Sequence, residues 1–314
     1  MNTELLAQLY QSYTGEAPTS IEPLPGAGSN RKYFRLKGKE SLIGVYGTST
    51  EENRAFIYMA RHFSQKGLPV PRILAEATDQ SAYLQDDLGD ISLFQLIKQG
   101  RESGNFSDEE TNILKRTIRL LPQIQFEGSK DMDFSYCYPA GNIQPPQRFV
   151  GPELFQYCFL KATGLEFQEN LLEDDFERMA DTLLQIEPQV FMYRDFQSRN
   201  VMIREGKPYF IDFQGGRKGP FYYDVASFLW QAKANYPDSL RQELLDEYLD
   251  ALRPYHTIDK EQFLTTLRHF VLFRTLQVLG AYGFRGYFEK KAHFIQSCTV
   301  CHRKSPSTAG NRFS

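Results

Sequence analysis

The sequence has few cysteines, no excess of positive charge and no long apolar segment, and each absence excludes a class of protein. Only 4 of its 314 residues are cysteines, too few for a fold held together by disulfide bonds. Its 36 lysines and arginines are outnumbered by 39 aspartates and glutamates, so no net positive charge is available to bind a nucleic-acid backbone. We therefore expect reduced thiols and no nucleic-acid partner.

The chain also lacks the features of membrane-bound and exported proteins. No stretch approaches the roughly 18 apolar residues that a membrane-spanning helix requires. The opening sequence MNTELLAQLY has neither the basic start nor the long apolar segment of a signal peptide. These absences predict a cytoplasmic protein with no membrane partner.

One short pattern near the C-terminus conflicts with this prediction. Cys298 and Cys301, followed by His302, match the C-x-x-C-H pattern of covalent haem attachment. Such attachment belongs to exported proteins, and a pattern this short arises readily by chance. A zinc site is also disfavoured, because no second pair of ligands follows. We therefore interpret the match as coincidental.

The composition is that of a globular protein, with 41% hydrophobic and 24% charged residues, and the length suits about two domains or lobes. Residues 20–84 predict short strands around a single helix. Residues 32–37 and 41–46 flank a turn at Gly38, which predicts a hairpin, and residues 51–61 have helical spacing. Further extended segments are predicted at residues 72–76 and 82–85. We expect a small antiparallel sheet with one helix.

The rest of the chain is mostly helical in pattern. Ser107 and Glu110 have the spacing of a capping box, which predicts the start of a helix. The other predicted helices cover residues 152–160, 175–185, 239–252 and 260–279. Two short β segments, 189–203 and 208–213, interrupt these helices on either side of a tight reversal at residues 205–207.

The strongest chemical pattern lies in and after these two β segments. Asp195 and Asn200 are five residues apart, and Asp212 follows at the end of an apolar run. Phosphoryl transfer requires a carboxylate that accepts the hydroxyl proton, and oxygen ligands for the Mg²⁺ that neutralises the nucleotide phosphates. A single aspartate would more simply be a loop cap or a surface carboxylate. The spacing and order of all three favour phosphoryl transfer.

These residues resemble the kinase fold and, more closely, the aminoglycoside phosphotransferase superfamily. Kinases have an H-R-D-x-x-x-x-N loop and then a D-F-G motif; here the loop reads Y-R-D-x-x-x-x-N from Tyr193 to Asn200, and the motif reads D-F-Q from Asp212. The later segment from Gly219 to Ser227 is also similar. Within the superfamily, the sequence is most similar to the anomeric kinases that phosphorylate N-acetylmuramate and N-acetylglucosamine in cell-wall recycling.

The resemblance extends over residues 20–296 and implies a fold. Residues 28–36 are similar to the first hairpin of that branch, and residues 85–90 to the hinge between its lobes. The implied fold is α+β and protein-kinase-like, bilobal, with a small antiparallel-sheet N-lobe and a larger, mainly helical C-lobe. The implied parts are an N-lobe at 1–84, a hinge at 85–90, a C-lobe at 91–296 and, at 297–314, a polar tail that departs from the branch.

Residue by residue, the resemblance implies a kinase site that uses ATP and Mg²⁺. Asp195 would be the catalytic base, in a loop that Arg194 steadies. Asn200 and Asp212 would hold the metal, and Asp224 would brace the loop as a buried carboxylate. The residues assigned to the bound nucleotide are Gly28, Ser29, Arg31, Arg35, Gln85 and Asp87.

One departure concerns the cation that binds the α- and β-phosphates. A protein kinase has a lysine on its third strand, but residues 42–47 contain none. Arg31, Tyr33 and Arg35 alternate and so share one face of a strand. The two arginines are either the substitute cations or solvated surface residues. A glycine turn at residues 26–28 would cover the phosphates.

The sequence says less about the acceptor, which we expect to be a small hydroxylated molecule, a sugar. Aromatic residues cluster at 134–138 and 155–159, where they predict either core packing or a stacking face for a ring. Residues 141–146 predict a loop over the cleft, and Arg217 would meet an anionic acceptor or pair with an acidic neighbour. The resemblance favours the anomeric hydroxyl of an N-acetylated amino sugar. The alternatives are a kinase for aminoglycosides, choline or amino alcohols, and a regulatory pseudokinase that binds nucleotide.

Overall fold

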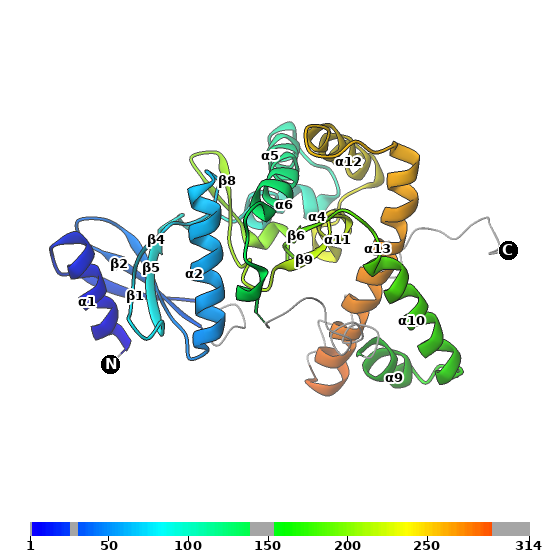
Figure 1. Cartoon of the computed structure of the whole chain (residues 1–314), viewed down its shortest axis with the longest axis horizontal. Helices are drawn as coiled ribbons and strands as arrows, with labels where there is room; N and C mark the ends of the chain where they lie inside the picture. Colours follow the sequence, from blue (N-terminus) through cyan, green and yellow to red (C-terminus); the bar gives the residue numbers. More distant parts are fainter. Residues whose placement is uncertain (1, 26–30, 139–153, 291–314) are drawn as a thin grey trace.

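The computed structural model describes residues 2–25, 31–138 and 154–290, which begin with a lobe built on a five-stranded antiparallel sheet (Figure 1). Its strands are β1 (Ser20–Leu24), β2 (Lys32–Lys37), β3 (Leu42–Tyr46), β4 (Ile73–Glu76) and β5 (Ala82–Asp86), in the spatial order β1-β2-β3-β5-β4. Their many β-branched and aromatic side chains favour extended backbone. The predicted hairpin is confirmed, since β2 and β3 pair with Leu36 opposite Leu42.

A helix that the sequence pattern did not reveal, α1 (Asn2–Thr14), covers the outer face of this sheet (Figure 1). Leu6 and Tyr10 are one helical turn apart, are fully buried and share an apolar cluster with Leu84 of β5. The hydroxyl of Tyr10 also donates to the carbonyl of Glu40 at 2.6 Å. The prediction of a single helix in this lobe is therefore wrong, because both faces of the sheet are apolar and each needs a covering helix.

The second helix of the lobe, α2 (Thr50–Gln65), lies between the sheet and the rest of the molecule (Figure 1). It begins at Ser49, whose hydroxyl caps the helix by accepting from the backbone N–H of Glu52 at 3.3 Å. Phe56 stacks on Phe213 of the second lobe with ring centroids 4.8 Å apart. Because one apolar core runs through α2 into both lobes, α2 is held against the second lobe.

The second lobe is mainly helical, which confirms the predicted bilobal α+β fold (Figure 1). Its α-helices are α3 (Leu93–Leu96), α4 (Lys98–Ser103), α5 (Asp108–Arg119), α6 (Leu121–Ser129), α9 (Lys161–Thr163), α10 (Glu169–Leu184), α11 (Tyr222–Leu229), α12 (Asp238–Leu252) and α13 (Lys260–Gly283). Shorter turns are η1 (Phe134–Tyr136), η2 (Phe155–Leu160), η3 (Ser198–Asn200), η4 (Ala232–Ala234) and η5 (Phe284–Phe288). The capping box is confirmed, because Ser107 and Glu110 each accept from the other's backbone N–H, at 3.0–3.2 Å.

Most predicted helices are present, with shifted ends. The predictions for residues 239–252 and 260–279 agree closely with α12 and α13, whereas α10 begins earlier than residue 175. The extra turn forms because Leu172 packs against the apolar cluster around Phe155. Among the described residues, no helix is long and apolar enough to cross a membrane. The predicted glycine turn, the proline-rich loop and the cysteine-containing tail lie outside the described residues.

Four short strands in the second lobe flank the segments that carry Asp195 and Asp212. β6 (Gln189–Met192) pairs with β9 (Arg217–Pro220), and β7 (Val201–Arg204) pairs with β8 (Lys207–Phe210), in two separate antiparallel ladders. The predicted continuous β segment at 189–203 is therefore wrong, because the chain leaves one ladder at Met192 and joins the other at Val201. The predicted segment 208–213 also ends early, at Phe210. Both Asp195 and Asp212 thus lie just beyond a strand.

Candidate active site

The loop of residues 193–200, which we call the Asp195 loop, joins β6 to β7 and is closed by its own hydrogen bonds. The side-chain amide of Asn200 donates from Nδ2 to the carbonyl of Asp195 at 2.8 Å. The carbonyl of Asn200 accepts from the backbone N–H of Ile211 at 3.0 Å, which ties the loop to the segment that carries Asp212. The structure therefore brings Asp195, Asn200 and Asp212 together.

A buried tyrosine lies at the centre of this group. Burial raises the pKa of Tyr193, and the nearby carboxylates of Asp212, Asp195 and Asp224 raise it further. The Tyr193 hydroxyl donates to the backbone carbonyl of Ile211. The phenol therefore stays protonated and donates this hydrogen bond, which ties the Asp195 loop to the residue before Asp212.

Asp224, at the start of α11, lies completely buried beneath the Asp195 loop. One carboxylate oxygen accepts from the backbone N–H of Arg194 at 2.9 Å, and the other from Tyr193 N–H at 2.9 Å and Gln125 Nε2 at 3.1 Å. Burial raises its pKa to about 6, although these hydrogen bonds oppose the shift. At pH 7 the carboxylate is therefore mostly ionised, and it fixes the loop backbone directly before Asp195.

Two residues of this region have left-handed backbone conformations that side chains other than glycine rarely adopt. Arg194 has a φ of 73°, and Asp212 has a φ of 66°. Such conformations cost about 1–3 kcal/mol each and occur often at functional sites. Here the bonds to Asp224 hold Arg194 in place, and Gln214 Nε2 donates to Asp212 Oδ1 at 2.8 Å.

Arg31 is the cation that the structure places beside the predicted metal ligand. It is buried, with 3% of its surface exposed, and its Nη2 lies 3.1 Å from Glu52 Oε1 of α2 and 3.4 Å from Asp212 Oδ1. Burial alone would lower the pKa of Arg31, but neighbouring acidic groups outweigh it, so that its pKa is raised. Arg31 and Glu52 therefore form a fixed ion pair on the inner face of the sheet, next to Asp212.

We expect Arg31→Gln to raise KM for ATP by about 10- to 100-fold, because a charge-assisted hydrogen bond contributes about 1.5–3 kcal/mol. KM can be compared with the ATP dissociation constant from calorimetry. Arg35→Gln is the matched control, since it removes the same charge from the same strand face. A larger effect for Arg35→Gln than for Arg31→Gln would contradict the assignment.

Arg35, the other predicted cation, instead binds the segment that connects the lobes. Its guanidinium donates to Asp87 at 2.7 and 3.1 Å and lies 2.7 Å from Asp90. Gln85 lies on β5, before these carboxylates in the chain. It is on the same face of the sheet as Arg35, because Gln85 and Arg35 both lie opposite Ile43 of β3. Of the predicted nucleotide residues, Arg31 therefore lies at Asp212, whereas Arg35, Gln85 and Asp87 lie together at the connection between the lobes. Gly28 and Ser29 lie outside the described residues.

The oxygens of Asn200 and Asp212 suit a magnesium ion. The Asn200 amide nitrogen is occupied by the Asp195 carbonyl, which leaves the amide oxygen to serve as a ligand. On Asp212, the donors Arg31 and Gln214 both bond to Oδ1, and 44% of its side chain remains exposed. The described residues contain no group of three or more His, Cys, Asp or Glu side chains placed to hold a metal ion together. Mg²⁺ needs no such cluster, since it binds one or two carboxylates together with substrate phosphates.

Asp195 lines a pocket of about 380 Å³, which we call the Asp195 pocket. Its wall combines the Asp195 loop, the end of α11, η4 and the C-terminal half of α13. The lining residues are Phe94, Asp195, Gln197, Arg199, Ser227, Trp230, Gln231, Ala232, Lys233, Arg274, Val278, Ala281, Tyr282 and Arg285. Gln231 also accepts from the backbone and hydroxyl of Ser198 at 3.1 and 2.8 Å, which joins this wall to the loop. A small acceptor bound here would lie against the predicted base.

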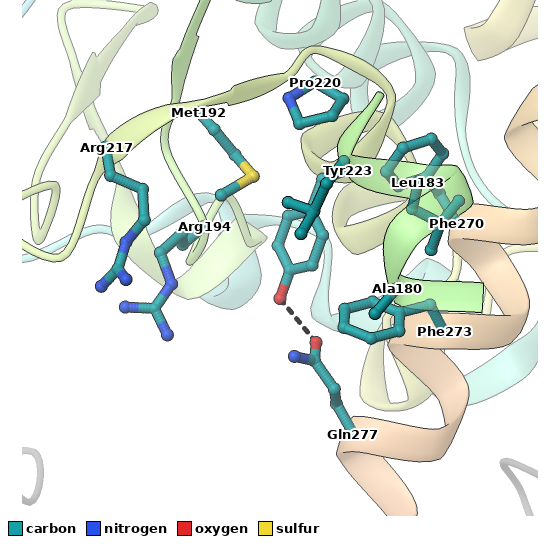
Figure 2. A pocket seen from close by; sticks show the side chains of 11 residues that line it. Ala180, Leu183, Met192, Arg194, Arg217, Pro220, Tyr223, Phe270, Phe273 and Gln277 are labelled. Atoms are coloured by element: carbon teal, nitrogen blue, oxygen red, sulfur yellow. Dashed lines mark hydrogen bonds between the residues drawn. The ribbon is translucent and has the colours of Figure 1, made fainter. Parts of the chain in front are cut away.

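A second, smaller pocket lies beside the first and is shown in Figure 2. The side chains of Arg194 and Arg217 lie next to each other at one end of this pocket. On the side formed by α13, the Tyr223 hydroxyl donates to Gln277 Oε1 at 2.8 Å. Burial, reinforced by the charge of Arg194, lowers the pKa of Arg217 to about 10. Arg217 therefore remains a cation at neutral pH, close to a second cation.

The family of the chain follows from comparison with known proteins. Residues 20–258 match the phosphotransferase enzyme family. This chain belongs to that family. The predicted membership of the aminoglycoside phosphotransferase superfamily is thereby confirmed.

Two curated relatives of this chain are named N-acetylmuramate/N-acetylglucosamine kinase. The protein from Pseudomonas aeruginosa is 27% identical over 237 residues, covering 74% of this chain and 65% of the relative. The protein from Neisseria meningitidis serogroup B is 27% identical over 191 residues, covering 59% of this chain and 53% of the relative. The chain thus spans less than two thirds of the length of these relatives.

Solved structures of other kinases share the fold. An amicoumacin kinase in complex with AMP-PNP, Ca²⁺ and Ami superposes with a TM-score of 0.67 at 12% identity, over 99% of this chain and 96% of that one. The choline kinase LicA from Streptococcus pneumoniae superposes with a TM-score of 0.62 at 13% identity, over 96% and 97%. At such identities the likeness establishes the kinase-like fold and leaves the acceptor undecided.

Several residues of the site were not predicted from the sequence. Glu52 could have been found, because a phosphotransferase that lacks the third-strand lysine still needs an acidic partner for its substitute cation, and Glu51 and Glu52 begin the helix after that strand. Trp230, Lys233 and Arg274 carry no such signal. They enter the Asp195 pocket only because α11, η4 and α13 fold against the Asp195 loop.

Proposed function

We propose that this chain transfers the γ-phosphoryl group of ATP to a hydroxyl of a small molecule, the anomeric hydroxyl of an N-acetylated amino sugar. One observation carries the proposal: Asp195 lines an open pocket while hydrogen bonds through Asn200 and Ile211 connect it to Asp212. A hydroxyl in the pocket and a metal-bound phosphate at Asp212 would therefore be neighbours.

Each residue has a distinct part in this reaction. Asp195 orients the acceptor hydroxyl and accepts its proton, while Asp224 fixes the loop backbone that carries the base. Arg31, held by Glu52, binds nucleotide phosphate oxygens. Mg²⁺, when bound by Asn200 and Asp212, neutralises the charge of the phosphates. The protein thus contributes mainly positioning and charge stabilisation.

A sugar acceptor suits the lining of the Asp195 pocket. Trp230, Phe94 and Tyr282 supply aromatic faces on which a sugar ring can stack. Gln197 and Ser227 supply polar groups for hydroxyls. The curated relatives named above support an N-acetylated amino sugar in particular. In that role the chain would act in the cytoplasm, on sugars released during cell-wall recycling.

The proposal predicts a sugar 1-phosphate as the product. The full chain is incubated with Mg-ATP and, separately, N-acetylmuramate, N-acetylglucosamine, choline, ethanolamine and an aminoglycoside, and products are followed by ³¹P NMR. We expect a new anomeric phosphate signal only with the amino sugars.

Two other outcomes would replace the proposal. Transfer to choline or an aminoglycoside alone would make the chain a kinase for a different acceptor. ATP binding without transfer to any acceptor of the panel would favour the regulatory pseudokinase.

A further inference from the structure

Cations outnumber carboxylates in the lining of the Asp195 pocket, although the chain as a whole has a formal net charge of −3. Among the described residues that line it, four are cations, from the Asp195 loop, η4, α13 and η5, and one is a carboxylate, Asp195. The four cations are the exposed Arg199, Lys233 and Arg285 and the half-buried Arg274. Because they come from separate segments, the fold gathers positive charge at this place.

The positive charge continues beyond this pocket. The Arg274 guanidinium lies over the ring of Tyr223, 5.8 Å from its centroid, and Tyr223 also lines the neighbouring pocket of Arg194 and Arg217 (Figure 2). Burial raises the pKa of Tyr223, and the charges of Arg274 and Arg194 act in the opposite direction. Tyr223 therefore lies between cations from both pockets.

Such a surface discriminates between acceptors by charge. Cations that line a partly enclosed cavity attract anions and repel cations more strongly than they would in open solvent. The pocket therefore disfavours choline and aminoglycosides, which are cationic at neutral pH. The names of the relatives do not decide between acceptors, since they combine N-acetylmuramate, which carries a carboxylate, with N-acetylglucosamine, which is neutral.

We propose that this chain selects an acceptor that carries a carboxylate, and that Arg274 and Lys233 are the residues that recognise it. The inference rests on the proposed function of the same pocket. Arg274 is half-buried on α13, where water screens its charge incompletely. Lys233, an exposed residue of η4, lines the pocket three residues after Trp230. Neither residue belongs to the Asp195 loop, so the residues that recognise the acceptor carboxylate and the residue that accepts the proton lie on different segments.

A different use of the same cations would be to stabilise the phosphoryl group in transfer, as positive groups do in other phosphotransferases. The two uses differ in their consequences. Loss of a phosphoryl-stabilising cation lowers kcat for every acceptor alike. Loss of a carboxylate-binding cation raises KM and the dissociation constant for the acidic acceptor alone.

The test compares N-acetylmuramate with N-acetylglucosamine, in binding by calorimetry and in steady-state kinetics. We expect the wild-type chain to bind the acidic sugar about 10-fold or more tightly than the neutral one, which corresponds to one charge-assisted contact. Arg274→Gln and Lys233→Gln should each remove most of this preference through the acidic sugar alone. Arg274→Lys, which keeps the charge, should retain it, and added salt should weaken it.

The matched control is Arg268→Gln, the same change on the exposed side of α13, outside the Asp195 pocket. It should leave the preference unchanged. Equal binding of both sugars by the wild-type chain, no binding of either, or equal losses for both in Arg274→Gln would overturn the inference. Selective binding of the acidic sugar without phosphoryl transfer would instead refute the proposed function and leave the charge selection intact.

Discussion

Asp195→Asn is expected to lower kcat by about 10²- to 10⁴-fold, the usual contribution of a positioned general base. Asparagine has nearly the same shape but cannot accept the acceptor's proton. The loop should keep its conformation, because its bonds to Asn200 and Asp224 involve the backbone carbonyl of Asp195 and the backbone N–H groups before it. Rapid-quench measurement of the sugar phosphate would give the rate, and calorimetry the affinity for ATP, which should change little.

Asp175→Asn provides the matched control for this experiment. Asp175 is an exposed aspartate on α10, paired with Arg178 one turn away, and its change should leave kcat unaltered. Turnover by Asp195→Asn within a few-fold of the wild type would show that the base lies elsewhere. A large loss of ATP affinity would instead indicate that the loop had been disrupted.

Asp212→Asn should abolish metal-dependent turnover, with a loss on the order of 10³-fold, since a bound metal contributes several kcal/mol to charge stabilisation in the transition state. The change removes the only carboxylate of the predicted metal pair. It also leaves Arg31 and Gln214 facing a neutral group, so that Arg31 loses the charge of Asp212 and keeps that of Glu52. Titration with Mn²⁺, followed by electron paramagnetic resonance, would measure metal binding directly.

The comparison variant for Asp212 is Asp90→Asn, which makes the same change at the connection between the lobes. Its partner is Arg35, and three quarters of its side chain is exposed. It should bind Mn²⁺ as the wild type does. Unchanged Mn²⁺ binding in Asp212→Asn would mean that the metal is held by other residues. Addition of EDTA to the wild-type chain should stop turnover, and excess Mg²⁺ should restore it.

The predictions that depended on local spacing agree with the structure. The hairpin of β2 and β3, the capping box of α5 and helices α12 and α13 all follow from patterns within one segment. The failures have a common physical cause. α1 has a weak hydrophobic pattern, and it forms because it buries the outer apolar face of the sheet. Residues 189–203 form two separate strands because the start of the segment pairs with β9 and its end pairs with β8.

The same division applies to the site. The order of Asp195, Asn200 and Asp212 in the chain was sufficient to predict a phosphotransfer site, since these residues lie on one loop and the end of the next strand. The choice between Arg31 and Arg35 could not be made, because the two lie on the same strand face. The structure separates them through their partners, which are Glu52 and Asp212 for Arg31 and the carboxylates of residues 87–90 for Arg35.

The sequence by itself was enough to predict phosphoryl transfer, because the proposed base, Asp195, and the proposed metal ligands, Asn200 and Asp212, lie at short spacing within one part of the chain. Only the tertiary structure assembles the pocket in which we propose that the acceptor binds. The Asp195 pocket takes its aromatic and cationic lining from α11, η4 and α13, which no spacing rule connects to the loop. The net charge of the whole chain therefore did not reveal the excess of cations in the Asp195 pocket. Net charge is a sum over all residues, whereas the pocket is lined by the few residues that folding brings together.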